Sequence, residues 1–579
     1  MTTWDWTRYT RWSSCPKFRS NIASRWTLKI SRTCARSATL LRSCPRSSSS
    51  VKRHFHMSQD PFSMALSNRR RRQTPLASDL CAEKELLPTI INEVRTFCGT
   101  HVDGTRIDSE RALGADLLSG VGERGWFGLT VPTRFGGSGL SLSGATRIIS
   151  ELAASNGSLG TCVGLHSGLA MHALIHIGTP AAQERFLPEL ALGKRIAAFA
   201  ATEPNAGSDI SAVRTRLSEI DGKLRLDGSK CYVTNGGICG ALTVLSQSPG
   251  LGGARAGHTL VLVDPRTPGV TVCREENKLG LKGSSTVSIV FEGVEIPYDQ
   301  VLGELSKGLD YAHQALSWGR TFMAAGCIGS ARAAVLDVVE HTRQRQQFGR
   351  ALIAFPLVRE SIARARAEVY AMESTLRLVC MLADSGHGEP LVASTMLKVL
   401  ASEGAWGVVD RALQLMGGTG YMEDACMARR LRDVRVTRIF EGANDVLRVS
   451  LAASALAWPV AQFDELCRDA FHLPEERSAE ARAWQHTCTH LASTISALKK
   501  LWGVRLFEQQ IIAADLADGM IFTFSALAVL ERMRAEADGD LAVARLALAI
   551  QLERANANLT RASTARETSF TELLAAVAG

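Results

Sequence analysis

A carboxylate between an aromatic residue and a glycine is the feature of this sequence best suited to catalysis. Glu441 stands in IFEGAND at 439–445, flanked by Phe440 and Gly442. An apolar setting raises the pKa of a carboxylate by desolvation and makes it a better proton acceptor, and a glycine lets backbone pass close to a ligand. Glu441 is therefore a candidate general base. The alternative is a structural carboxylate near the start of a helix beginning about Asn444, where negative charge is favoured in any case.

Other stretches carry the hydroxyl, cationic and glycine residues typical of a ligand site. They are AATEPNAGSD at 200–209, SKCYVTNGG at 229–237, RQQFGR at 345–350, and QLMGGTGYMED at 414–424 followed by LRD at 431–433. Thr202 and Thr234 offer hydroxyls that either hold a ligand or cap the ends of strands. Arg345 offers the paired donors that suit a phosphate, or else belongs to a solvated helix face. The GGTG at 417–420 follows a helix, so it is not a dinucleotide fingerprint of the Rossmann kind.

Taken together and in this order, these stretches resemble the acyl-CoA dehydrogenase flavoprotein family over residues 85–455. KKLWGVRLFEQQIIAADLADG at 499–519 resembles the C-terminal extension of the very-long-chain branch, and GLHSGLAMHALIHIGT at 164–179 resembles its substrate-pocket helix. The resemblance implies α,β-dehydrogenation of long-chain acyl-CoA thioesters to trans-2-enoyl-CoA in fatty acid β-oxidation. FAD would be the cofactor, and electron-transferring flavoprotein would take the electrons. It also implies a homodimer in the mitochondrial matrix or on the matrix face of the inner membrane, with peripheral membrane association left open.

The resemblance assigns a role to individual residues. Glu441 would take the α proton, while its backbone N–H and a ribityl hydroxyl of FAD hold the thioester oxygen. Arg345 would reach the FAD pyrophosphate of a neighbouring subunit. The implied cofactor-binding residues are Thr202, Tyr232, Thr234, Arg345, Gln347, Phe355, Gln414, Gly418, Ala443 and Asp445. The implied substrate-binding residues are Ser208, Arg320, Phe440 and Gly442, although Arg320 could equally be a structural ion-pair partner.

Two positions depart from the pattern of that family. Tyr232 stands where the family usually has tryptophan, so a smaller ring would pack against the flavin. Ala443 stands where the family usually has threonine, which removes a hydroxyl that would contact FAD. The loss of one hydrogen bond is worth about 1 kcal/mol, so we still expect FAD to bind.

The hydrophobic periodicity predicts the elements that must position these residues. Helical spacing begins about Asp79, short β-branched segments run from Ala197 to about Leu302, and long helical periods return from Leu309 to about Ala455. We therefore expect a mostly α protein with a central β domain. The resemblance implies the acyl-CoA dehydrogenase-like fold, with an N-terminal helical domain, a middle β-barrel and a C-terminal helical bundle, here followed by an extra C-terminal helical domain. The expected divisions are a leader at 1–78, an N-terminal helical domain at 79–197, a β domain at 198–302, a helical bundle at 303–455 and the added helical domain at 456–579.

The net charge of +9 on this 579-residue chain is concentrated at its beginning. Residues 1–78 hold 16 Lys or Arg against Asp5 and Asp60, a balance of +14, so the remaining 501 residues carry −5. A nucleic-acid-binding body needs basic residues clustered on its folded surface, so no nucleic-acid partner is expected. The Arg- and Ser-rich leader has the composition of a mitochondrial transit peptide. The alternative is an untranslated or disordered leader upstream of a start at Met57 or Met64.

Residue spacing argues against a membrane span, a disulfide framework and a metal site. No continuous apolar run reaches the roughly 18 to 20 residues needed to cross a bilayer, so no membrane span is expected. The 14 cysteines are scattered without a CxxC pair, which favours reduced thiols in a reducing compartment. His172 and His176 have helical spacing, but no nearby acid completes a zinc motif, so we expect helix packing and no metal.

Two other functions stay open at this point. The same fold could serve mainly as a binding module in an assembly or scaffold protein for respiratory complex I. A peroxisomal acyl-CoA oxidase would use the same base, but the final AVAG is not the usual peroxisomal address.

The predicted pocket helix offers Gly164, Gly168 and Ala170, whose missing bulk would deepen an acyl tunnel. The alternative is that these small residues let two helices pack closely.

Overall fold

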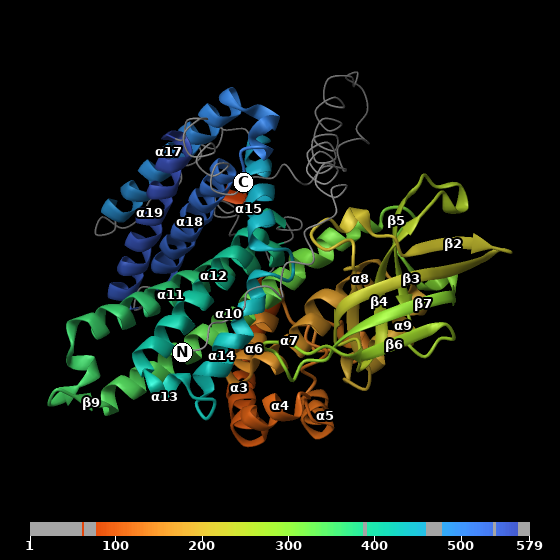
Figure 1. Cartoon of the computed structure of the whole chain (residues 1–579), viewed down its shortest axis with the longest axis horizontal. Helices are drawn as coiled ribbons and strands as arrows, with labels where there is room; N and C mark the ends of the chain where they lie inside the picture. Colours follow the sequence, from red (N-terminus) through yellow and green to blue (C-terminus); the bar gives the residue numbers. More distant parts are fainter. Residues whose placement is uncertain (1–60, 63–76, 386–390, 459–477, 537–539, 565–579) are drawn as a thin grey trace, which may run out of the picture.

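The computed structural model describes residues 61–62, 77–385, 391–458, 478–536 and 540–564. Figure 1 shows a β domain on one side of the molecule and a large helical body on the other, with the last helices stacked on that body. The element order is helical, then β, then helical, followed by further helices near the C-terminus. This arrangement confirms the fold class predicted from the sequence.

The first helical part, from Ala77 to Ala191, contains seven α-helices. They are α3 (Ala77–His101), α4 (Gly104–Glu110), α5 (Ala115–Glu123), α6 (Leu142–Ser155), α7 (Gly157–Leu165), α8 (Met171–Ile177) and α9 (Pro180–Ala191). The Asn156 side chain caps α7 by accepting from the backbone N–H groups of Ser158 and Leu159. A π-helical turn at His166–Ala170 joins α7 to α8. Such turns occur frequently at functional sites, and this one lies in the predicted pocket helix.

The β domain is one twisted sheet. Its strands are β1 (Ile196–Ala200), β2 (Arg216–Ile220), β3 (Lys223–Thr234), β4 (Cys239–Ser248), β5 (Gly257–Val263), β6 (Val270–Glu275), β7 (Thr286–Ile296) and β8 (Val301–Leu302). They are ordered β6-β7-β3-β2-β4-β5-β8, and β1 pairs in parallel with β4. The backbone N–H of Cys231 on β3 donates to the carbonyl of Thr202, 2.9 Å away, just after β1 ends. The sheet therefore brings the two threonine-bearing segments together.

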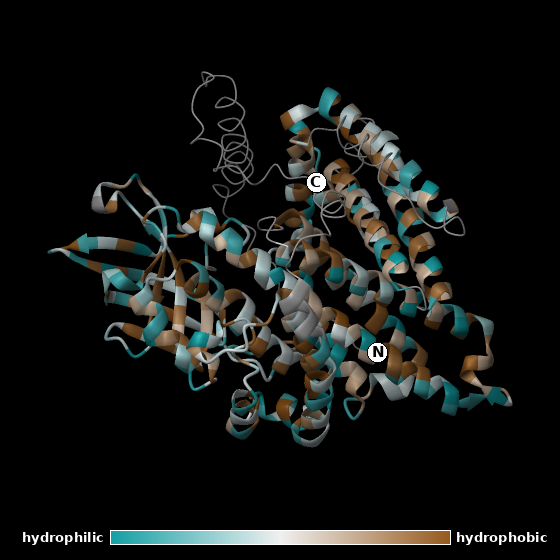
Figure 2. Ribbon diagram, turned by 180° about the vertical axis from the view of Figure 1, so that it is seen from behind, coloured by the Kyte–Doolittle hydropathy of each residue, from teal (hydrophilic) through white to brown (hydrophobic). Residues whose placement is uncertain are grey.

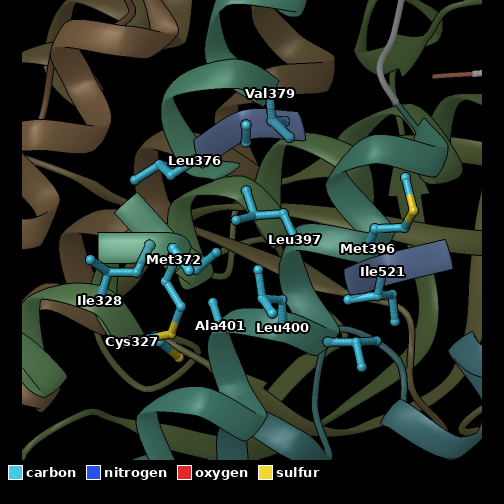
Figure 3. Packing of buried hydrophobic residues seen from close by; sticks show 14 of the residues in the cluster. Cys327, Ile328, Met372, Leu376, Val379, Met396, Leu397, Leu400, Ala401 and Ile521 are labelled. Atoms are coloured by element: carbon cyan, nitrogen blue, oxygen red, sulfur yellow. The ribbon is translucent and has the colours of Figure 1, made fainter. Parts of the chain in front are cut away.

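The central helical body is built on three long helices. They are α10 (Gly308–Gln344), α11 (Pro356–Asp384) and α12 (Leu391–Met416). The short hairpin β9 (Gln346–Gln347) and β10 (Arg350–Ala351) joins the first two, and α13 (Gly418–Tyr421), α14 (Cys426–Arg435) and α15 (Asn444–Leu456) follow the third. Figure 3 shows Met396, Leu397, Leu400 and Ala401 of α12 packed among side chains of the neighbouring helices. α12 is thus a central core element.

Three further helices pack on this body. They are α17 (Ser478–Leu501), α18 (Gln510–Ala535) and α19 (Leu541–Thr564). Their apolar residues join the same buried cluster as α10, α11 and α12, and Figure 2 shows hydrophobic positions gathered where the helices face one another. The extra helices are therefore part of a continuous core.

An aromatic residue of the predicted leader, Phe62, packs into the fold. Phe62 is fully buried, with its ring centroid 5.9 Å from Trp458 and 5.4 Å from Phe524, both in edge-on geometry. An aromatic side chain buried in this way contributes to the core, while the leader boundary at residue 78 stays a prediction. The predicted transit peptide otherwise falls mainly on 1–60 and 63–76, which lie outside the described residues.

Three helical segments are long and apolar enough to cross a membrane by length and composition. They are Gly157–Ile177, Gly308–Gln344 and Gln510–Ala535. Continuous apolar runs did not reveal these segments, because scattered glycine, serine and threonine interrupt each run without making the segment polar on average. That no segment spans a membrane stays a prediction. In this fold the larger part of each apolar window is buried inside the protein, up to 89% in the first.

Candidate active site

Glu441 occupies a strained turn between α14 and α15. Its φ is +56° and that of Gly442 is +96°. A left-handed conformation at a residue other than glycine costs on the order of 1–3 kcal/mol and persists only where the surroundings over-determine it. A Cβ on Gly442 would also lie 3.0 Å from Leu447, so the turn needs a glycine there.

Two buried cations hold this turn from behind. The Arg320 Nε donates to the carbonyl of Glu441 at 3.1 Å, and its Nη1 donates to Thr395 Oγ1 at 2.9 Å. The Lys398 Nζ donates to the carbonyl of Gly442 and to Asn444 Oδ1, both at 2.7 Å. Consecutive carbonyls of the turn are thus each bound by a cationic side chain, one from α10 and one from α12.

The carboxylate of Glu441 lies in an apolar setting. Its Oε2 is enclosed and accepts no hydrogen bond from the residues that the structure describes. A Cβ on Gly319 would lie 3.0 Å from this oxygen and 3.2 Å from Leu169 Cδ1. Leu169 belongs to a small buried cluster with Leu165 and Ala315. The apolar wall therefore includes residues distant in sequence, whereas the sequence had pointed only to the adjacent Phe440 and Gly442.

Burial shifts the ionisation of all three charged groups toward their neutral forms. Desolvation raises the pKa of Glu441 to about 7, and the positive charges of Arg320 and Lys398 oppose this rise. Desolvation also lowers the pKa of Arg320 to about 10 and that of Lys398 to about 7. A general base works best when its pKa lies near the operating pH, so Glu441 suits proton abstraction near neutrality.

The two threonines of the β domain present accessible hydroxyls. Thr202 and Thr234 are half-buried, and neither hydroxyl has a hydrogen-bond partner within the described parts of the chain. Tyr232, on the same strand as Thr234, has a φ of +56° and is 68% exposed. Ser208 is exposed on the loop that follows Thr202. Free hydroxyls beside an exposed aromatic ring fit a flat, polar-edged ring system such as a flavin.

A buried ion pair that the sequence reasoning missed fixes this loop. The Lys230 Nζ donates to Glu203 Oε1 at 2.8 Å and to the carbonyl of Ala201 at 2.9 Å. Glu203 also accepts from the backbone N–H groups of Arg214 and Thr215. Residues on both sides of Thr202 are therefore tied to β3, and the threonine is held in place.

The hairpin segment that carries Arg345 and Gln347 lies far from these threonines within one chain (Figure 1). Arg345 and Gln347 are exposed at the hairpin that ends α10, and Phe355 follows it. Figure 1 shows this hairpin at the far end of the helical body from the β domain. Gln414, Gly418 and Asp445 are exposed and lie near the ends of α12, α13 and α15. Ala443 directly precedes α15.

A cavity of about 40 Å³ is lined in part by Phe440, the residue that precedes the candidate base. Its walls come from α6, α7, α10 and α14, and they include Gly160, Thr161, Gly164, Phe322 and Phe440. A Cβ on Gly164 would make only ordinary contacts, 3.5 Å or more. The cavity is thus widened where α7 carries glycine.

The other two predicted tunnel residues do not line this cavity. A Cβ on Gly168 would lie 2.5 Å from Phe322 Cδ2, so this glycine permits close helix packing. Ala170 belongs to a separate buried cluster. The predicted tunnel is corrected accordingly, because only Gly164 of the three faces open space.

The two histidines of α8 lie in an aromatic cluster. The ring centroids of His172 and His176 are 4.4 Å apart, and those of His172 and Trp318 are 4.9 Å apart. Burial lowers the pKa of both histidines. Among the described residues, no group of three or more His, Cys, Asp or Glu side chains could hold a metal ion.

Family models match the three central parts of the chain. Those described as the acyl-CoA dehydrogenase N-terminal, middle and C-terminal domains match residues 87–194, 198–294 and 306–456. The candidate base and both threonines fall within these matches.

Individual relatives agree with the models. The mitochondrial very long-chain specific acyl-CoA dehydrogenase of Macaca fascicularis is 34% identical over 64% of this chain, and the chain spans 57% of that relative's length. An acyl-CoA dehydrogenase of Bacillus subtilis (strain 168) is 33% identical over 58% of this chain and 88% of its own. A solved acyl-CoA dehydrogenase of Bacillus anthracis, complexed with FAD, has a TM-score of 0.77 at 23% identity and covers 85% of this chain and 91% of its own. That likeness of fold extends beyond the three matched domains.

Proposed function

The chain belongs to the acyl-CoA dehydrogenase family, and from this premise we propose that it dehydrogenates long-chain acyl-CoA thioesters at the α and β carbons. The observation that carries the proposal is the Glu441 carboxylate, whose Oε2 is enclosed in an apolar setting and unpartnered among the described residues. A structural carboxylate at a helix start would instead be paired or solvated. An unpartnered acceptor in an apolar wall is suited to receive a proton from carbon.

In the proposed reaction Glu441 removes the α proton of the thioester. FAD, when bound, takes up the β hydrogen with the electron pair, and the product is the trans-2-enoyl thioester. The backbone N–H of Glu441 holds the thioester oxygen, and the left-handed turn fixes its direction. Arg320 keeps the Glu441 carbonyl occupied from the opposite side, so the turn presents its N–H and its carboxylate to the substrate.

We propose that FAD is held by residues of two copies of the chain. Thr202 and Thr234 would bind the ring through their unpartnered hydroxyls, and Tyr232 would pack against it. Arg345, Gln347 and Phe355 lie too far along the helical body to join them in one chain (Figure 1), and a homodimer would supply these residues to the partner's cofactor. Gln414, Gly418, Ala443 and Asp445 would complete the site.

Three arguments support a long-chain substrate and a mitochondrial setting. The cavity lined by Gly164 and by Phe440, next to the base, would take part of an acyl chain. The Macaca fascicularis relative is named as a mitochondrial very long-chain enzyme, and residues 1–78 carry the basic balance of a transit peptide. Electron-transferring flavoprotein would be the electron acceptor, and peripheral contact with the inner membrane remains part of the proposal.

Turnover by the purified, FAD-loaded chain tests the proposal. Acyl-CoA of about 4 to 20 carbons would be offered with an artificial electron acceptor, while flavin absorbance is followed without oxygen. We expect bleaching by acyl-CoA and the highest kcat/KM for long chains, because each buried methylene contributes about 0.8 kcal/mol. The matching free fatty acids are the control. A flavin that no acyl-CoA bleaches, in a protein that co-purifies with respiratory subunits, would favour the scaffold function instead.

A fusion experiment tests the localisation separately. Residues 1–78 joined to a fluorescent protein should direct it to mitochondria, because their charge balance is that of a transit peptide. A cytosolic or nuclear signal would contradict the mitochondrial assignment and leave the chemistry untouched.

A further inference from the structure

Lys398 is a fully buried lysine directly behind the candidate base. It lies on α12, and its side chain is among the largest of those that are fully buried. Its Nζ donates at 2.7 Å to the carbonyl of Gly442 and at 2.7 Å to Asn444 Oδ1. Asn444 is itself held through its Nδ2, which donates to Ser402 Oγ at 3.0 Å and to Glu403 Oε1 at 2.9 Å. The turn that carries Glu441 is therefore anchored to α12 at two points.

Resting on the proposed function, we propose that Lys398 is a positioning residue for the base Glu441, fixing the turn through the Gly442 carbonyl while its charge favours the carboxylate. It forms no hydrogen bond to that carboxylate among the contacts of the described residues. Arg320 performs the corresponding task at the adjoining carbonyl from α10. The two cations thus hold the backbone and leave Oε2 without a hydrogen-bond partner among the described residues.

A purely structural role does not account for a charged group at this place. Burying an ammonium ion costs several kcal/mol unless it is compensated, and a neutral amide could donate to the same two oxygens. The groups that act on Lys398 electrostatically are Cys327 and Arg320 of α10, Glu403 of α12 and Glu441 itself. Glu403 is already paired with Arg438 at 2.7 Å and with Arg448 at 3.4 Å. The negative charge that remains to compensate the positive charges of Lys398 and Arg320 is therefore the carboxylate of Glu441.

Replacing the ammonium by a methyl thioether of similar length tests this role. Lys398→Met should raise the pH at which the Glu441 carboxyl titrates by at least one unit. The measurement is the infrared carboxyl band of the FAD-loaded protein, with Glu441→Gln as the reference that lacks it. The same variant should lose at least tenfold in kcat with acyl-CoA while KM changes less than threefold, because the base is displaced but the acyl site is intact.

Two other variants separate positioning from general damage. Leu397→Ala alters the neighbouring fully buried residue of α12 and should leave the Glu441 titration in place even if it weakens the fold. Lys398→Gln keeps an N–H donor without the charge, so it should recover part of the lost kcat while the titration stays raised. If Lys398→Met does not fold, the same titration measured on Lys398→Gln tests the proposal.

The outcomes are distinguishable from those of the proposed function. An unchanged Glu441 titration in a folded Lys398→Met or Lys398→Gln protein would overturn the inference, and so would a kcat loss no greater than that of Leu397→Ala. If the parent protein dehydrogenated no acyl-CoA, the proposed function would fail, whereas a raised titration in Lys398→Met would still establish the coupling to Glu441.

Discussion

Gly319 on α10 faces the carboxylate of Glu441 without any side chain between them. A Cβ at that position would lie 3.0 Å from Glu441 Oε2 and 3.2 Å from Leu169 Cδ1. Separations of this size are tighter than side chains normally tolerate, and the buried surroundings leave little room to relax. The base therefore has its position because a helix in the middle of the core lacks a side chain there.

Adding that one methyl group should disturb the base selectively. Gly319→Ala is expected to lower kcat at least tenfold with FAD retained, because Oε2 must move away from its position. Stopped-flow flavin reduction measures this directly. Gly407→Ala on α12 is the matched control, since a Cβ there meets nothing within 4 Å, and it should keep parental activity while gaining up to about 1 kcal/mol of helix stability. Equal rates for Gly319→Ala and the parent would show that the contact does not position the base.

The activity should depend on pH through the ionisation of Glu441. Burial raises the pKa of this carboxyl to about 7, and only the deprotonated form can accept a proton. We expect kcat/KM to rise about tenfold per pH unit below that value and to level off above it. A profile that is flat between about pH 5 and pH 8 would argue against Glu441 as the base in the free enzyme.

The same group should make stability fall as pH rises. Its pKa in the folded state is raised above the ordinary value of 4.5, so the folded state binds the proton more tightly than the unfolded state. The resulting stabilisation is complete below pH 4.5 and is lost as pH rises through about 7. Glu441→Gln should therefore gain in Tm relative to the parent between pH 5 and pH 8. A pH-independent difference in Tm between the two proteins would contradict the raised pKa.

The sequence predicts the part of the site that lies in short continuous stretches. Glu441, Thr202 and Thr234 stand in recognisable motifs, and the change from helical to β periodicity places the β domain. Lys398 was missed because a lone lysine in a helix usually faces solvent. Its one signal is the apolar run around it, with Met396, Leu397, Val399 and Leu400 as neighbours.

Contacts between distant segments could not be derived from the pattern. Gly164 and Gly168 look alike in sequence, yet one lines a cavity and the other packs on Phe322. Which glycine faces open space depends on how α7 crosses α10, and no local pattern encodes that crossing. Phe62 was assigned to the leader for the same reason, because its partners Trp458 and Phe524 lie some 400 residues away along the chain.

Filling the cavity should shorten the preferred acyl chain. Gly164→Leu places a side chain into space that is open in the parent, and each methylene excluded forfeits about 0.8 kcal/mol of binding. We expect the kcat/KM optimum to move down by several carbons. Gly168→Ala is the contrast, since its clash with Phe322 should lower Tm without moving the optimum. A length profile that does not change in folded Gly164→Leu would refute a role for this cavity in holding the chain.

The buried Phe62 should limit how much of the N-terminal leader can be deleted without loss of stability. Deleting 1–60 retains Phe62 and should leave Tm close to that of the parent. Deleting 1–78 removes a side chain buried against Trp458 and Phe524, and losses of about 3–5 kcal/mol are typical for truncating a buried phenylalanine. Phe62→Ala in the longer protein should reproduce most of that loss. Identical Tm values for the two deletions would show that Phe62 contributes nothing to stability.

The central claim is that Glu441 takes a proton from an acyl-CoA. Its most direct test is the rate of flavin bleaching after FAD-loaded Glu441→Gln is mixed with a long-chain acyl-CoA without oxygen. Glutamine keeps the shape of the side chain and the hold of Arg320 and Lys398 on the turn, so FAD should remain bound. The account predicts bleaching at least 10²-fold slower than in the parent, as is common when a general base is lost. Bleaching at the parental rate would contradict it.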